Sequence, residues 1–273
     1  MSSTPRARTN DDLVERAHLA IDRGDPRRAQ RLLKSLDEGA TKGGRVDVAY
    51  LRWRLASLDE DPAAALKVAE ANADSFPDSP EVQHALGWSL LDANRAEEAI
   101  PWLEEACYLD PDFGDAWHDL AIARELIGDI AGMRQAFAEV HSIDTAEPRP
   151  PLHFTPEQVQ KWAQRAFDLL PADIQERVAD VPVFVADYPD AWILEDAPWD
   201  PRLLGLFDGP TWAERKRGDF VGAPHIYLYQ RNLEQLCGND PRAMATEVRV
   251  TVHHEIGHFL GLDEEDLHAR GLG

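Results

Sequence analysis

The stretch "PEVQHALGWSLLDANRAEEAIPWLEEACYLDPDF", residues 80–113, has the length and pattern of one unit of a 34-residue repeat. Its small and large residues fall at fixed places in two expected helices: Leu86 and Gly87 in the first, Ala99, Leu103 and Ala106 in the second, and Pro111 behind them. Small residues let paired helices approach closely, whereas larger ones fill the seam to the next pair. The stretch therefore predicts an antiparallel pair of helices.

The same spacing recurs on both sides of this unit. A shift of 34 residues forward reaches Trp117, Leu120, Ala121, Phe137 and Val140, and a shift back reaches Ala65, Ala69 and Pro77. An earlier unit, with Gly24-Asp25-Pro26 as its turn and Ala29 as its small residue, is offset by 36 because of the loop "EGATKGGR". Repeats of this length each form one supersecondary unit. We expect three to four stacked helix pairs.

This pattern resembles the tetratricopeptide (TPR) repeat family over residues 10–145. The resemblance implies a concave groove in which a protein partner binds as a peptide. The alternative is that the short array only packs against a second domain. Four tryptophans recur at helical spacing and are interpreted as core rather than as ligand platforms: Trp53, Trp88, Trp102 and Trp117.

Length and composition restrict the remaining possibilities. A chain of 273 residues can form two domains, each with its own hydrophobic core. The net charge of -22, with both halves acidic, argues against nucleic acid and anionic lipid as partners. Because no apolar run is long enough for a membrane span and the first ten residues have no apolar signal segment, we expect a cytoplasmic protein. Cys107 and Cys237 form no CxxC pair and are interpreted as packing residues.

A proline-rich segment, residues 146–156, is expected to link the array to a second domain at 157–273. In that domain "TPEQVQKWAQRAFDLLP" predicts an amphipathic helix, "VPVFVADYP" a short buried strand and "HIYLYQRNLE" a second strand. The intervening "DAWILEDAPWDPRLLGLFDGPTWAERKRGDFVGAP" is expected to be loop-like, with a possible strand at 203–207. A long helix should begin after Asp240 and end at Gly261.

That long helix carries His254-Glu255-x-x-His258, the HExxH pattern. Residues four apart lie on one helical face, so the two imidazoles can converge on one zinc ion (Zn²⁺). Glu255 points to the side, where it can accept a proton from water that attacks a peptide carbonyl. His253 faces another way and is interpreted as a packing residue or as support for the ligands.

The third ligand is sought among the acids of "DEEDL", residues 263–267. Asp263 and Asp266 fit the N-cap and N3 positions of a short terminal helix, which would occupy the oxygens of Asp263. Glu264 is then the favoured ligand. Asp263, Glu265, Asp266 and an acid elsewhere remain alternatives, as does a purely helix-capping role for the four acids.

Residues 152–273 resemble the minimal zincins, small metallopeptidases with the motif HExxHxxGxxD. The resemblance rests on "FTPEQVQKWAQRAFDLLP", "VPVFVADYP", "LLGLFDGPTW", "HIYLYQRNLE" and "EVRVTVHHEIGHFLGLDEEDL", in that order. It implies zinc held by His254, His258 and the residue at the terminal Asp position, which is Glu264 here. It also implies a strand beside the active-site cleft that pairs with extended substrate. The matching residues are His225, Ile226, Tyr227, Leu228 and Tyr229.

The fold prediction is thus an all-α TPR-like array followed by a small α/β (α+β) zincin-like domain. The functional prediction is a zinc metallopeptidase whose array recruits a protein partner, with a groove that favours basic or neutral peptides. Zinc itself, Tyr227, Tyr229, His225 and His268 are the candidates for stabilising the oxyanion. The alternative is an adaptor whose zincin domain binds zinc without turnover. A purely structural zinc site is disfavoured because such sites usually have four protein ligands.

Overall fold

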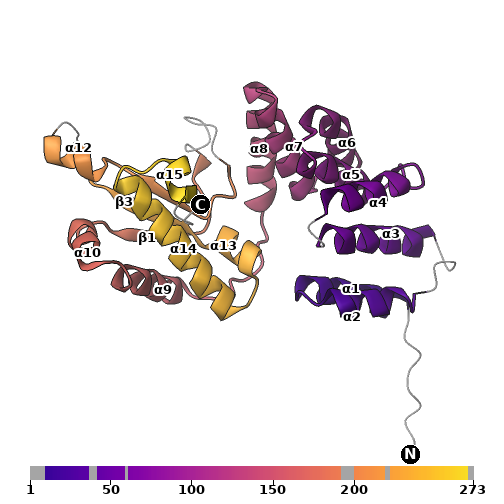
Figure 1. Ribbon diagram of the computed structural model, residues 1–273, viewed down its shortest axis with the longest axis horizontal. Coiled ribbons are helices and arrows are strands. Elements are labelled where there is room, and N and C mark those ends of the chain that lie inside the picture. Colours follow the sequence, from indigo (N-terminus) through magenta and orange to yellow (C-terminus); the bar gives the residue numbers. More distant parts are fainter. Residues whose placement is uncertain (1–9, 37–41, 59–60, 192–199, 219–221, 270–273) are drawn as a thin grey trace, which may run out of the picture. The chain divides into compact units, whose positions relative to one another are not determined.

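The computed structural model describes residues 10–36, 42–58, 61–191, 200–218 and 222–269. The chain divides into two compact units, residues 1–144 and 145–273 (Figure 1). The first is all-helical and the second combines helices with a three-stranded sheet. No helix among the described residues is both long and apolar enough to cross a membrane. The predicted fold class, an all-α array followed by a small α/β domain, is confirmed.

The helices of the first unit follow one another as antiparallel pairs. They are α1 (Asn10–Asp22), α2 (Pro26–Leu33), α3 (Lys42–Ser57), α4 (Pro62–Ala73), α5 (Pro80–Asp92), α6 (Ala96–Leu109), α7 (Gly114–Leu126) and α8 (Ile130–Asp144). The pairs meet at the small residues of the repeat. A Cβ at Gly87 of α5 would lie 2.5 Å from Leu103 Cγ of α6, so only glycine permits this approach.

The tryptophans of the array belong to its core, as expected from their spacing. Trp53 is buried, and its indole N–H donates to Ser89 Oγ at 2.8 Å. Trp88, Trp102 and Trp117 are half-buried and pack against the same cluster. Cys107 is also buried in this cluster as a free thiol.

The second unit contains a sheet of three short strands with helices on one face. Its elements are α9 (Pro156–Asp168), α10 (Ala172–Val178), β1 (Val183–Ala186), β2 (Gly205–Asp208), α12 (Trp212–Arg217), β3 (His225–Tyr229), α13 (Gln230–Cys237), α14 (Pro241–Phe259) and α15 (Glu264–Ala269). The strand order is β1-β3-β2, with β1 parallel and β2 antiparallel to β3. The central strand is therefore β3.

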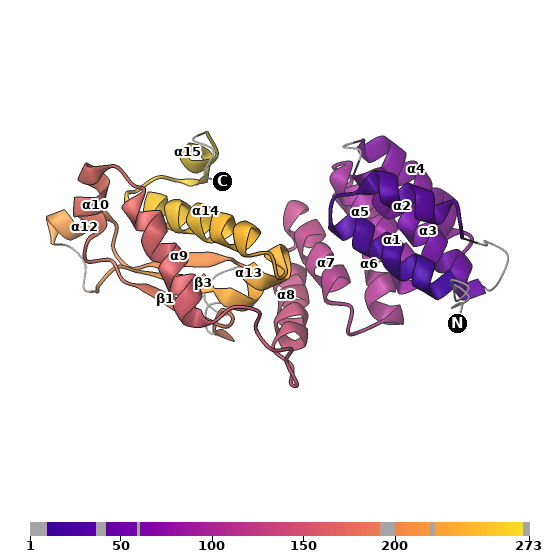
Figure 2. The ribbon, with the colours of Figure 1, turned by 90° about the horizontal axis from the view of Figure 1, so that it is seen from below.

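Helices α9 and α14 lie side by side over the sheet (Figure 2). Between them and the sheet is a core that includes Val159, Trp162, Val252, Ile226 and Leu228. His253 of α14 bonds the carbonyl oxygen of Ala166 on α9 through Nε2 at 2.9 Å. His253 thus faces α9, as the helical geometry suggested. This packing fixes α14, which carries the HExxH pattern.

Several local predictions need correction. The segment "HIYLYQRNLE" is a strand only to Tyr229, because Gln230 begins α13. The expected loop between the first two strands contains α12, which begins with a capping box between Thr211 and Glu214. Residues 192–199 of that loop lie outside the described residues. Strand β1 is half-buried rather than buried, since it lies at the edge of the sheet.

The proline-rich segment belongs to the second unit rather than standing free as a linker. The carboxylate of Glu234 on α13 accepts the backbone N–H groups of His153 and Phe154 at 2.8 and 3.2 Å. The side chain of Gln230 donates to the carbonyl of Phe154, and Arg231 donates to that of Pro150. Proline leaves few backbone donors in this segment, so α13 supplies side chains that satisfy its carbonyl groups.

Candidate metal centre

The α14 helix begins with Pro241 at its first position and Asp240 as N-cap, whose carboxylate accepts the N–H of Arg242 at 2.8 Å. It ends at Phe259, before Gly261 with φ of 91°. The left-handed conformation at Gly261 turns the chain back, and α15 then packs its buried Leu267 against α14.

Two histidines and one carboxylate converge where α14 and α15 meet. The Nε2 atoms of His254 and His258 are 3.0 Å apart. Glu264 lies 3.2 Å from Nε2 of His258 and 3.7 Å from Nε2 of His254. These three residues form the one group of His, Cys, Asp or Glu side chains among the described residues that could hold a metal ion. Sequence reasoning placed the same three together.

The hydrogen bonds of His258 orient its free nitrogen toward the cluster. Its Nδ1 lies 3.1 Å from the carbonyl oxygen of Leu262. A carbonyl only accepts, so Nδ1 carries the proton and Nε2 presents a lone pair toward His254. Such a backbone contact behind a ligating imidazole is common in metal sites. The turn at Gly261 therefore also fixes the tautomer of His258.

The geometry of this cluster fits zinc. Two ligand atoms on a tetrahedral zinc, at bond lengths of about 2.0–2.1 Å, lie roughly 3.3 Å apart, close to the separations in this cluster. Two lone pairs facing each other at 3.0 Å would repel without a cation or proton between them. Two imidazoles and a carboxylate are a ligand set of catalytic zinc sites, and three protein ligands leave one position open.

Asp263 is placed in a different role. Its Oδ1 accepts the N–H of Asp266 at 2.9 Å, and its backbone carbonyl accepts the N–H of Leu267. It therefore caps α15, which occupies one of its two carboxylate oxygens. The side chain of Glu264 is 75% exposed, so the cluster is accessible to solvent.

A single glycine lets α15 approach the two histidines. A Cβ at Gly257, between His254 and His258, would collide with Cδ2 of Leu267. Leu267 is fully buried and is the buried residue of α15, and its side chain lies in the space that the missing Cβ of Gly257 leaves. Gly257 and Leu267 together place Glu264 over the histidine pair. Sequence reasoning missed this contact, although a glycine inside a long helix often signals close packing.

Glu255 lies beside the cluster and is buried, with 6% of its surface exposed. Its Oε2 accepts the backbone N–H of Phe207 on β2 at 2.7 Å. Burial raises the pKa of Glu255, and Glu264 raises it further, while His254, His258 and the Phe207 N–H oppose the increase. Its carboxylate is therefore a better proton acceptor than an exposed glutamate.

Gly205 brings β2 close enough for this contact. A Cβ at Gly205 would lie 2.5 Å from Cγ2 of Thr251 and 3.2 Å from Cγ of Glu255. Any larger residue would push β2 away from α14. The sequence showed this glycine only as part of "LLGLF", and nothing in the pattern connected it with the HExxH helix.

The strand expected to pair with substrate, His225 to Tyr229, is not available for that role. It is β3, and its two edges already pair with β1 and β2. The expectation was wrong because alternation identifies a strand without revealing its place in the sheet. The metal-side edge of the sheet belongs instead to β2, which contacts Glu255.

The side chains considered for oxyanion stabilisation lie in different surroundings. The Tyr229 hydroxyl is buried without a hydrogen-bond partner among the described residues, and burial raises its pKa, so it cannot meet a substrate. His225 contacts Asp208 at 3.1 Å. Tyr227 is half-buried, and His268 is exposed on α15.

Comparisons with known proteins agree with this two-part organisation. Residues 178–273 match the family of zincin-like metallopeptidases. A TPR repeat-containing protein of Pseudomonas aeruginosa is 37% identical over 62 residues, which are 23% of this chain and 59% of that protein. The chain thus spans less than two thirds of the length of this curated relative.

Two solved structures are similar at a TM-score of 0.40 and 18% identity. One is a single-substitution mutant of MamA, covering 49% of this chain and 77% of that one, and the other is a double mutant of MamA RS-1, covering 62% and 88%. The repeat and the family match together show a TPR-like array followed by a region similar to zincin-like metallopeptidases.

Proposed function

We propose that the second unit is a zinc metallopeptidase and that the TPR-like array recruits a protein partner for it. The observation that carries this proposal is the convergence of His254, His258 and Glu264 beside a buried Glu255. The residues would hold zinc through the two Nε2 atoms and the Glu264 carboxylate. Zinc bound there would polarise a peptide carbonyl and lower the pKa of a water molecule.

The residues of the chain then have separate tasks. Glu255 accepts the proton of the attacking water and passes it to the leaving amine. Its raised pKa favours the first step, because a weakly basic carboxylate would accept the proton poorly. The N–H of Phe207 holds one carboxylate oxygen, which leaves the other to contact water.

The substrate edge is reassigned to β2. Because the N–H of Tyr229 donates to the carbonyl of Leu204 at 3.0 Å, alternate residues of the antiparallel ladder, Gly205 and Phe207, direct their backbone groups away from β3. Phe207 directs its N–H toward Glu255 on that outer side. An extended substrate pairing with this edge would run beside the proposed general base.

The array supports the recruiting part of the proposal. Its helix pairs are TPR-like, and TPR-type folds commonly serve protein interaction. The excess of acidic residues favours a basic or neutral partner. Tight binding of an acidic peptide by the array at low salt would contradict this part.

The first test measures zinc content by elemental analysis in wild type, Glu264→Ala and Glu265→Ala. Glu265 is the adjacent exposed acid and lies outside the cluster, so it is the matched control. We expect near-stoichiometric zinc in wild type and Glu265→Ala, and a loss in Glu264→Ala. Absence of zinc from reconstituted wild type would refute the site.

The second test measures turnover of a quenched-fluorescent peptide library by wild type and Glu255→Gln. We expect cleavage by wild type and a loss of at least a hundredfold in the variant, with zinc content unchanged. Cleavage that persists in Glu255→Gln would exclude the proposed mechanism. Full zinc occupancy without cleavage of any library peptide by wild type would instead favour the adaptor alternative.

A further inference from the structure

At the edge of the sheet opposite β2, no strand of the described residues pairs with the outer side of β1. The N–H of Ile226 donates to the carbonyl of Pro182 at 3.0 Å, which fixes the parallel pairing of β1 with β3. In this pairing the N–H and C=O groups of Val183 and Val185 point away from β3. They have no backbone partner among the described residues. An extended chain could pair there.

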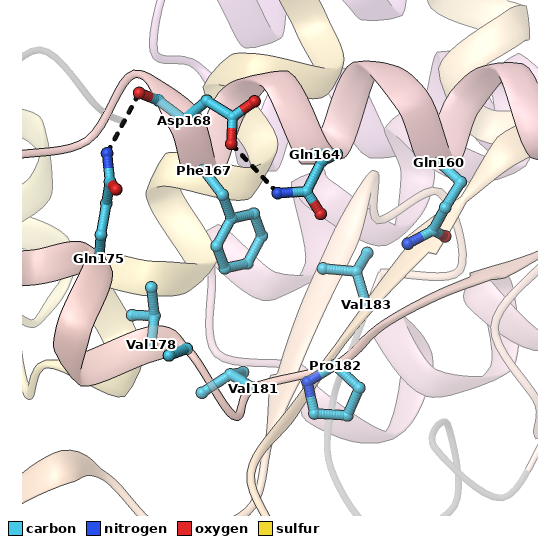
Figure 3. Close-up of a pocket in the computed structure, with 10 residues that line it drawn as sticks. Gln160, Gln164, Phe167, Asp168, Gln175, Val178, Val181, Pro182 and Val183 are labelled. Atoms are coloured by element: carbon cyan, nitrogen blue, oxygen red, sulfur yellow. Dashed lines mark hydrogen bonds between the residues drawn. The ribbon is translucent and has the colours of Figure 1, made fainter.

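A cavity of about 360 Å³ opens beside the start of this edge, between α9, α10 and β1 (Figure 3). Its polar lining comes from Gln160, Gln164 and Asp168 of α9 and from Gln175 of α10. Phe167 and Val178 are among its apolar residues. A cavity of this size lies at the small end of the range for ligand sites.

The donors of this lining are largely used within the protein. The amide N–H₂ of Gln164 donates to the carboxylate of Asp168 at 3.2 Å. That of Gln175 donates to the carbonyl groups of Asp168 and Leu170 at 3.1 and 2.8 Å. The amide oxygens and the Asp168 carboxylate therefore remain as acceptors, and Gln160 adds an amide without a partner among the described residues.

The charge of the cavity selects the occupant. Asp168 is its one charged lining residue, and no Lys, Arg or His contributes to the lining. An acceptor-rich site with an apolar wall suits a side chain that has methylene groups and a cationic tip. Lysine and arginine have this combination. A carboxylate in the same place would face Asp168 and several acceptor oxygens.

The edge and the cavity form one surface. Val183 belongs to both, and its side chain packs toward the helix-covered face of the sheet. Figure 3 shows the side chains of Gln164 and Phe167 projecting from α9 on the side where Val183 lies. A strand paired with β1 alternates its side chains between the two faces, so one of them enters the space between α9 and α10.

We propose that this surface, the β1 edge with its adjacent cavity, docks an extended segment of a partner protein through a lysine or arginine side chain. Main-chain hydrogen bonds to Val183 and Val185 would give affinity, and the cavity would give specificity for the cation. The docked segment lies at the opposite edge of the sheet from Glu255. The inference therefore stands independently of the proposed peptidase function.

The test uses fluorescence anisotropy with a labelled, blocked peptide Thr-Val-Arg-Val-Thr and its counterpart with Glu in place of Arg. The full chain is used without added metal, so that failure of the zinc site cannot mask the result. We expect the Arg peptide to bind at least tenfold more tightly than the Glu peptide. Equal binding of the two peptides would overturn the cationic specificity.

Variants then locate the binding. Asp168→Lys reverses the charge of the cavity, whereas Glu176→Lys makes the same change on an exposed position of α10 outside the lining. We expect at least a tenfold loss for Asp168→Lys and a change of less than twofold for Glu176→Lys. Equal losses in the two variants would mean that peptide binding depends on net charge and not on the cavity. Undiminished binding by Asp168→Lys would mean that the peptide binds at another surface, such as the acidic array.

The edge itself is tested by amide chemical shifts in isotopically labelled protein. Addition of the Arg peptide should move the Val183 and Val185 amide signals, whose N–H groups point outward, more than those of the β3 residues. Val185→Pro removes one of these outward donors and no β1–β3 hydrogen bond. It should weaken binding severalfold, and unchanged Val183 and Val185 signals at saturating peptide would refute the β-strand pairing.

Discussion

Both units of the protein place two histidines beside one carboxylate, with opposite outcomes. In the array, Asp119 of α7 lies between the imidazoles, 2.7 Å from Nε2 of His84 and 3.8 Å from Nδ1 of His118. In the second unit the imidazoles of His254 and His258 face each other at 3.0 Å, and Glu264 approaches from outside.

The difference lies in which group occupies the centre. A central carboxylate that bonds Nε2 of His84 and lies 3.8 Å from Nδ1 of His118 fills the space between the rings. Facing imidazole nitrogens leave a centre that only a cation or a proton can fill favourably. The same residue types thus form a packing network in one unit and a candidate metal site in the other, because they are placed differently on their helices.

The contrast between the two units would fail most clearly if zinc stayed bound after one of the facing imidazoles was removed. His258→Ala should reduce zinc affinity by more than a hundredfold, because removing a ligand costs more than the 10- to 100-fold typical of its supporting contacts. The measurement is competition with a chromophoric chelator. His84→Ala is the matched control and should leave zinc affinity unchanged; a parallel loss there would mean that both triads bind metal.

A smaller effect is expected when the central carboxylate of the array is removed. Asp119→Asn should lower the free energy of unfolding of the array by about 2 kcal/mol, since it weakens a hydrogen bond to a mostly buried imidazole. Hydrogen exchange of the α5 and α7 amides in the full chain reports this unit alone. Glu105→Gln, an exposed acid on α6, is the control. Unchanged protection in Asp119→Asn would contradict a structural role.

The pH dependence of the stability of the array tests the structural role of Asp119 further. Burial of Asp119 raises its pKa, but the hydrogen bonds from His118 and His84 outweigh this, and the pKa is lowered overall. The resulting stabilisation is present above the unfolded-state value of about 3.9 and is lost as pH falls through the folded-state value. Array stability measured by exchange at decreasing pH should fall in that range. Asp119→Asn should show a shallower fall; an equally steep one would assign the dependence to other acids.

The smallest change is expected from loosening α15. Leu267→Ala removes the side chain that fills the space left by Gly257, so Glu264 is held less firmly over the histidines. Zinc affinity should fall by about tenfold, as for other contacts that support a ligand. Leu260→Ala, a half-buried neighbour that packs on the sheet core, serves as a control for local packing. An affinity equal to that of wild type would show that Leu267 does not position Glu264.

Sequence alone could predict the parts of this molecule that depend on local spacing. A 34-residue period places Gly87 against Leu103, and the i, i+4 spacing places His254 beside His258, because both relations lie within a helix or helix pair. The choice of Glu264 over Asp263 also followed from a local rule, the capping of a short helix. It remains a prediction until metal is measured.

Contacts between residues far apart in the chain could not be predicted from the sequence. Alternation identified His225–Tyr229 as a strand, but the sheet order depends on which strands pair, and that information is spread over about 45 residues of chain. Gly205 could not be connected with Glu255 for the same reason. The hydrogen bonds from α13 side chains to residues 150–154 likewise could not be predicted, because the partners lie about 80 positions apart in the chain.

Because Leu267 packs against Gly257, the position of the proposed third ligand, Glu264, depends on whether α15 is docked on α14. Glu264 belongs to a six-residue helix, too short to be stable alone, whose buried residue is Leu267. Docking of α15 sets the effective concentration of its carboxylate at the histidine pair, and bound metal would hold α15 down in return. A molecule that binds α15 in its undocked position would therefore compete with zinc binding without contacting either histidine.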